Sequence, residues 1–162
     1  MAGADLAEEF RHRFGPSAEA YHTIVASEAW DVHRPWAEAH RDRYDPVVWQ
    51  RLNRVHGITP PQRESAGKVL ADVRIAWAQY FTEHDFLVLP ASPGPALTKA
   101  DCTLGNRGRI ITLTAPASLG GRPVLTLPVN LAGGLTTGLQ VVVADASSPV
   151  IPWILGLRSG AG

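Results

Sequence analysis

The sequence predicts an α/β fold in which a group of helices is followed by a few strands. Its two halves differ sharply. Residues 1–85 hold 13 acidic and 10 basic residues and all six histidines, whereas residues 86–162 hold 2 acidic and 5 basic residues and 11 of the 15 glycines. Apolar residues recur at three- and four-residue spacing in the first half, which is typical of amphipathic helices, and stand in short continuous runs in the second, which is typical of buried strands.

About four helical segments are expected before residue 85. The first begins at Ser17 and carries an apolar stripe as far as Val32, and Pro35 ends it or opens a short second helix. The pattern over Asp45–Gly57 predicts a helix: Asp45 supplies a capping carboxylate, a proline follows at the first helical position, and Gly57 ends the helix. Thr59–Gln62 predicts a capping box for a long helix with a continuous apolar stripe.

Strands are expected after Asp85, where the apolar period changes. Three apolar runs are predicted as strands: Phe86–Pro90, Pro123–Val129 and Gly138–Val143. The first of them is expected to be buried on both faces. Residues 91–108 are expected to form a loop that is long enough to line a site. Arg109–Ala115 is expected to form a short helix, and Ser148 to begin a last short helix. We expect an N-terminal tail over residues 1–16, one partial domain over 17–157 and a frayed tail over 158–162.

Composition excludes several classes of function. The 162 residues suit one domain, and 15 basic residues balance 15 acidic ones, so nucleic acid and anionic membrane surfaces are not expected partners. Cys102 is the single cysteine, which excludes an intramolecular disulfide and a multi-cysteine zinc site. No apolar run has the length of a membrane span and the N-terminus has no signal-type pattern, so a cytoplasmic protein is expected.

The residues show no complete catalytic apparatus. Ser118 lacks the first glycine of a nucleophile elbow, and a turn or capping role is favoured for it; Ser147-Ser148 is better interpreted as a helix start. The pair Gly120-Gly121 could let backbone amides approach a ligand, but two adjacent glycines are weak evidence for such a site. A reactive thiol at Cys102 is the less favoured interpretation of that residue, because no activating group is identifiable beside it.

The histidines and lysines point to no site either. The six histidines lie on polar helical segments without metal-ligand spacing, so solvated or capping roles are favoured over metal binding: His12, His22, His33, His40, His56 and His84. Lys68 falls on an exposed helical face. Lys99 lies in the long loop, where a solvated role is favoured over substrate contact. We therefore expect no catalytic, cofactor-binding or metal-binding residue in this chain.

The order of motifs nevertheless resembles a known family. The segments that carry the resemblance are Asp85–Pro95, Arg107–Val129 and Gly138–Val143, preceded by Glu28-Ala29, Tyr44–Val47 and the helix from Pro60. Together they resemble, over residues 17–157, the C-terminal third of amidase signature enzymes. The resemblance implies an α/β fold with a large mixed sheet, and hydrolysis of a carboxylic amide by a nucleophilic serine, a second serine with a cis peptide bond, and a lysine, with no metal or organic cofactor.

Those three catalytic residues belong to the first half of family members, and nothing in this chain corresponds to them. At most, Ala91–Asn106 and Pro116–Gly121 would line the substrate pocket, and Ser118 occupies a position that the family often fills with asparagine. The expected function is therefore that of a C-terminal portion, inactive alone, whose partner is an N-terminal amidase half or a second copy. A small amide would be bound only by the completed enzyme.

Two other interpretations stay open. One is a non-catalytic binding or scaffolding domain derived from an amidase, and the other an enzyme with its own site at Ser118 or Cys102. If the chain is a detached part, its sheet is expected to have an open edge next to Phe86–Leu89 or Val141–Val143.

Overall fold

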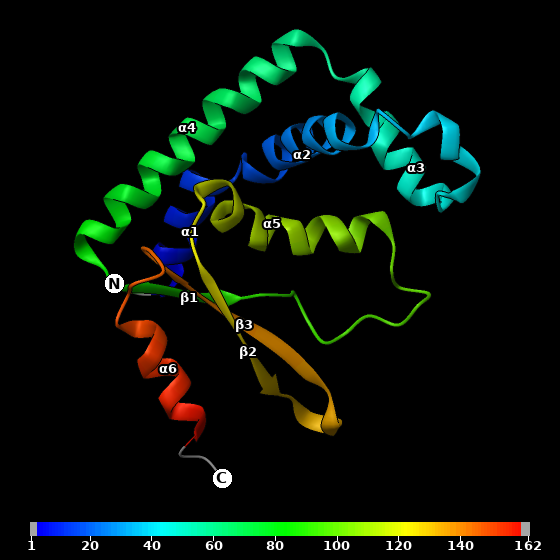
Figure 1. The fold of residues 1–162 in the computed structure, drawn as a ribbon. Coiled ribbons are helices and arrows are strands. Elements are labelled where there is room, and N and C mark those ends of the chain that lie inside the picture. Colours follow the sequence, from blue (N-terminus) through cyan, green and yellow to red (C-terminus); the bar gives the residue numbers. More distant parts are fainter. Residues whose placement is uncertain (1–2, 160–162) are drawn as a thin grey trace.

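The computed structural model describes residues 3–159 and places a layer of helices against a three-stranded sheet (Figure 1). The elements follow in this order: α1 (Gly3–Phe14), α2 (Ser17–His33), the 3₁₀ helix η1 (Glu38–Arg43), α3 (Pro46–Asn53), η2 (Arg54–Gly57), α4 (Pro60–Glu83), β1 (Phe86–Pro90), α5 (Leu104–Gly120), β2 (Val124–Asn130), η3 (Ala132–Gly134), β3 (Thr136–Val143) and α6 (Val150–Ser159). Helices followed by a few strands were expected from the sequence, and the structure confirms this.

The local start signals of the helices work as predicted. The Asp45 carboxylate accepts a hydrogen bond from the Val47 amide at 2.8 Å, which caps α3. At the start of α4 the Thr59 amide donates to Gln62 Oε1 at 2.8 Å, and the Gln62 amide donates back to Thr59 Oγ1 at 3.4 Å. Both contacts are local, so a short stretch of sequence was enough to predict them.

The first helix lies in the segment where the sequence suggested a tail. Residues 3–14 form α1, and Phe14 at its end is buried against Trp77 of α4, with 4.6 Å between the ring centroids. Phe10 and Phe14 are four residues apart and so lie on one face of the helix. The domain boundaries at 17–157 stay a prediction, and residues 160–162 of the expected C-terminal tail lie outside the described residues.

The sheet has the order β1-β3-β2, and both pairings are antiparallel. The mixed sheet implied by the family resemblance is therefore not present among these three strands. Because β3 follows β2 through a short turn, it runs antiparallel to β2 and lies in the centre. The expected open edge is correct for Phe86–Leu89 of β1 and wrong for Val141–Val143, which have a hydrogen-bonded strand on each side.

Helices cover the two faces of the sheet unequally. On one face Leu87 and Val142 pack with Trp77 and other residues of the helical layer, and on the other face Val141 and Val143 pack against Ile154 of α6 (Figure 1). The central strand is thus buried on both faces. The prediction that the first strand is also buried on both faces was wrong, because α6 packs on β2 and β3 and leaves outward-facing residues of β1 exposed.

One helix departs from its predicted form, and the last helix forms as expected. The expected short helix over Arg109–Ala115 is the 17-residue α5, which Thr103 caps, so the preceding loop ends at residue 103. It continues through Pro116 to a left-handed cap at Gly121. The last helix forms despite Pro152, because that residue lies in the first turn, where backbone amides have no helical acceptor.

A buried polar side chain joins the strands to α5. Gln140 of β3 is 2% exposed, and its Nε2 donates to the Pro90 carbonyl of β1 and to the Leu113 carbonyl of α5, each at 3.0 Å. This amide therefore fixes how α5 lies across the sheet.

Candidate functional site

A hollow between α2, α3 and α5 collects positive charge. It has a volume of about 330 Å³, and Arg51, Arg54, Arg107 and His22 lie around it. Tyr21, His33 and Gly108 also line it, and apolar side chains form the rest of its wall: Val25, Ala26, Ala29, Val48, Leu52 and Ile111. We call it the arginine hollow.

No acidic side chain lies in the wall of the arginine hollow, although Glu19 lines an adjoining hollow that shares His22 and Arg54 with it. The residues that line the arginine hollow include neither aspartate nor glutamate. Within residues 3–159, none of the ion pairs involves Arg51, Arg54 or Arg107. Burial, followed by the positive charges of Arg54 and Arg107, lowers the pKa of His22 below its ordinary value of 6.5.

The lowered pKa of His22 predicts an acid-sensitive contribution to stability. An unfolded chain takes up a proton at His22 more readily than the folded chain, so the free energy of unfolding should fall as the pH drops below 6.5 and should level off below the folded-state pKa. Urea unfolding over a pH series should show this loss in the wild type and its removal in His22→Gln. Arg54→Gln should reduce the loss, whereas Arg74→Gln should not. An unchanged pH dependence in His22→Gln would contradict the assignment.

The arginine hollow continues toward the long loop. A second hollow of about 380 Å³ shares Arg51 and Arg107 with it, and Leu97, Cys102 and Thr103 line its loop side. The loop within Ala91–Asn106 therefore borders a hollow next to α3. Its role as the wall of a substrate pocket stays a prediction.

The other expected wall segment, Pro116–Gly121, forms the end of α5 against α4. The indole Nε1 of Trp77 donates to the Pro116 carbonyl at 2.8 Å, and Gly120 lies directly against the same indole ring. These contacts are structural, since they hold α5 on α4.

The candidate nucleophiles lack activating partners. Ser118 is exposed inside α5, where its hydroxyl donates to the Thr114 carbonyl at 3.2 Å, so the turn or capping role expected for it was wrong. Cys102 is exposed in the loop. Across the described residues no serine or cysteine side chain is hydrogen-bonded to a histidine or lysine, so nothing there matches a nucleophile paired with its base.

The remaining serines and lysines are structural or solvated. Ser147 donates to Asp145 Oδ1 at 2.6 Å, and Ser148 Oγ accepts from the Val150 amide at 3.4 Å. The predicted helix start is thus confirmed. Lys68 pairs with Glu64 at 2.7 Å on an exposed face of α4, also as predicted.

Several histidines contact aromatic rings rather than only solvent. His33 Nδ1 lies 2.8 Å from the Tyr44 hydroxyl, His84 stacks on Tyr80 and His56 packs edge-on against Trp30. Sequence spacing could not show these contacts, because most join separate elements. In the described part of the chain, histidine, cysteine and acidic residues form no group of three or more that could hold a metal ion.

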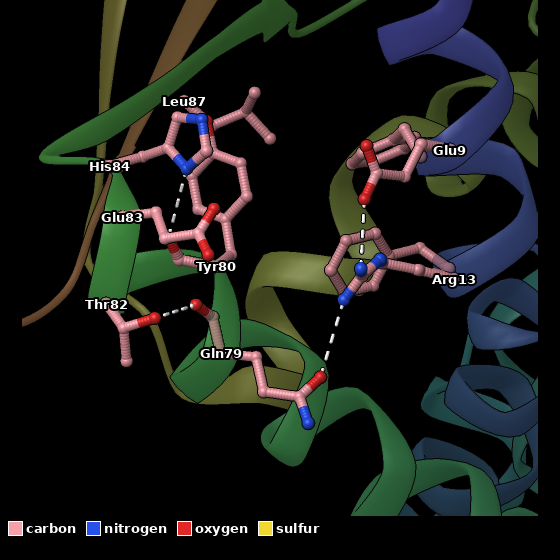
Figure 2. A pocket seen from close by; sticks show the side chains of 10 residues that line it. Glu9, Arg13, Gln79, Tyr80, Thr82, Glu83, His84 and Leu87 are labelled. Carbon is pink, nitrogen blue, oxygen red and sulfur yellow. Dashed lines mark hydrogen bonds and ion pairs between the residues drawn. The ribbon is translucent and has the colours of Figure 1, made fainter.

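A further hollow of about 350 Å³ lies between α1 and the end of α4 (Figure 2). Arg13 pairs with Glu9 at 2.9 Å and donates a hydrogen bond to Gln79 at 3.4 Å, and Glu83 also lines this hollow. The Tyr80 hydroxyl donates to the Phe86 carbonyl, and burial, with a smaller effect of Glu9, raises the pKa of Tyr80. This network joins α1 to α4 and neutralises the one arginine that lines the hollow.

Comparison with known proteins shows which proteins share the fold of this chain. No family model matches the chain. Over 80 residues it is 34% identical to the glutamyl-tRNA(Gln) amidotransferase A protein of Tropheryma whipplei (strain TW08/27), and the match covers 48% of this chain and 15% of that relative. The crystal structure of an amidase matches with a TM-score of 0.77 and 25% identity over 99% of this chain and 43% of its own.

A third matching structure is that of an enzyme from the amidase signature family. A bacterial aryl acylamidase belonging to the amidase signature enzymes matches with a TM-score of 0.64 and 16% identity, over 83% of this chain and 31% of its own. The chain thus has the fold of the C-terminal part of these enzymes and spans less than half of their length. No helix within residues 3–159 is long and apolar enough to cross a membrane.

Proposed function

We propose that this chain, with the fold of the C-terminal part of amidase signature enzymes, serves as that part of a hydrolase that cleaves carboxylic amides. The observation that carries the proposal is the match of 99% of the chain to 43% of an amidase at a TM-score of 0.77. Because no activated nucleophile occurs among the described residues, hydrolysis requires the serine–serine–lysine segment that the resemblance assigns to the remainder of the fold.

The incomplete cover of strand β1 supports the proposal that a partner packs against this strand. Phe86 and Val88 of this strand are 36% and 46% exposed, and Trp153 of α6, with its ring centroid 6.3 Å from that of Phe86, is 57% exposed. We call these three residues the β1 patch. Within the described chain, β1 is paired only with β3, so its other edge is open to a further strand. The remainder of the amidase fold is the occupant we propose for this edge, since the matched amidase is more than twice as long as the chain.

Unfolding of the purified 162-residue chain tests its autonomy. Urea unfolding is followed by tryptophan fluorescence, and we expect the folded chain to bind a hydrophobic dye strongly without denaturant, because the β1 patch is uncovered. A single sigmoidal transition with little dye binding would contradict this and would favour the non-catalytic binding or scaffolding domain. A stable dimer that hides the β1 patch would instead favour a second copy as its occupant.

An ammonia-release assay tests the chemistry. The chain is co-expressed with the N-terminal segment of an amidase signature enzyme, and we expect a complex that releases ammonia from a small primary amide. The same segment with its nucleophilic serine changed to alanine should form the complex without activity. Absence of both complex and ammonia would overturn the proposal. The cytoplasmic location expected from the sequence stays a prediction.

A further inference from the structure

We propose that the arginine hollow binds a small organic anion, with a carboxylate or phosphate group held by Arg51, Arg54 and Arg107 and an apolar body resting on Val25 and Val48. This inference does not depend on the proposed amidase function, because it rests only on residues that line the hollow in this chain.

The first argument is charge. Arg51 and Arg54 lie three residues apart, at the end of α3 and the start of η2, and the fold brings Arg107 of α5 beside them around a hollow whose wall has no acidic residue. Among the described residues, Arg11, Arg13 and Arg34 are paired with acidic neighbours, and other arginines such as Arg63 and Arg74 are unpaired, so what distinguishes the three is that they surround one hollow. Three like charges around one hollow repel one another, and an anion in their midst would convert that repulsion into charge-assisted hydrogen bonds.

The second argument is the apolar wall. Val25 and Val48 are 37% and 41% exposed and lie on the same hollow as the arginines. A ligand that carries both an anionic group and an apolar body would cover these side chains, whereas an inorganic ion would leave them in water. The volume of about 330 Å³ is in the range of pockets for small organic ligands.

His22 adds a neutral donor to the site. Its lowered pKa reflects burial first and then the nearby charges of Arg54 and Arg107, and it favours the uncharged ring. An uncharged imidazole still has one N–H that can donate to an anion.

Isothermal titration calorimetry of the full chain with four probes tests the proposal: benzoate, its neutral counterpart benzamide, phenyl phosphate and inorganic phosphate. Above the ordinary histidine pKa and at low salt, we expect at least one of the two organic anions to bind about tenfold more tightly than benzamide. Arg54→Gln and Arg107→Gln should each weaken that binding about tenfold, whereas Arg74→Gln, an exposed arginine of α4 outside the hollow, should not.

The outcomes identify the anionic group that the hollow binds and test the roles of the arginines and the apolar wall. Tighter binding of benzoate assigns the hollow to carboxylates, and tighter binding of phenyl phosphate assigns it to phosphate esters. Equal binding of the organic anions and benzamide would overturn the proposal, as would an equal effect of all three arginine variants. Inorganic phosphate that binds as tightly as phenyl phosphate would overturn the role of the apolar wall. Far-UV circular dichroism of each variant separates lost binding from lost folding, because these exposed or half-buried arginines have no ion pair to break.

Discussion

Replacement of Trp77 by alanine should lower the free energy of unfolding by about 3–5 kcal/mol, the largest effect expected of any substitution considered for this chain. The indole is fully buried, and its ring lies 4.6 Å from Phe14 and 5.5 Å from Phe81 between centroids. It also donates the hydrogen bond to the Pro116 carbonyl, so its removal leaves a cavity and loses this bond where α1, α4 and α5 meet.

Urea unfolding followed by far-UV circular dichroism measures this loss. Trp153→Ala is the matched control: that tryptophan is 57% exposed, and its substitution should cost less than about 1 kcal/mol. Similar losses in both variants would show that Trp77 is not the centre of the helical layer.

Replacement of Gly120 by alanine should cost about 1–3 kcal/mol, because a methyl group has no room there. A Cβ at this position would lie 2.3 Å from Cδ1 and 2.8 Å from Nε1 of Trp77. The ring cannot move away easily, since it is buried and hydrogen-bonded to the same helix. Gly67 in α4 is the matched control, because nothing lies within 4 Å of a Cβ there, and Gly67→Ala should stabilise the helix by up to about 1 kcal/mol.

A double substitution separates this clash from other effects of alanine. If Gly120 is required because it faces the indole, then Gly120→Ala should cost little in a Trp77→Ala background, where the cavity can accept the methyl group. Urea unfolding of the four proteins gives the coupling energy. Additive losses would contradict the contact between Gly120 and Trp77 as the cause.

Local signals were sufficient for much of the fold. The capping carboxylate of Asp45, the capping box at Thr59 and the apolar runs of the three strands predicted elements that the structure contains. The family resemblance, which rested on the order of several motifs, was confirmed by the structural match to an amidase. The caps and the apolar runs depend on residues near one another in the chain, and the resemblance depends on the order of motifs along it, so no knowledge of packing was needed.

The candidate site was harder to predict, because its residues come from separate elements. Arg51 and Arg54 lie in the first half of the chain and Arg107 in the second, and no spacing rule connects Arg107 with the other two. The excess of basic over acidic residues after residue 85 includes Arg107 alone, since Arg51 and Arg54 lie in the half where acidic residues outnumber basic ones.

The sequence by itself determined where α2, α3, α4 and β1 begin, that helices precede strands, and which part of a known fold the chain resembles, since caps, prolines and apolar periodicity act over a few residues. Only the tertiary structure decided that α1 packs on Trp77, that β3 lies between β1 and β2, and that three arginines surround one hollow. These features depend on contacts between segments far apart in the chain, whose energies come from burial and charge in three dimensions rather than from local pattern.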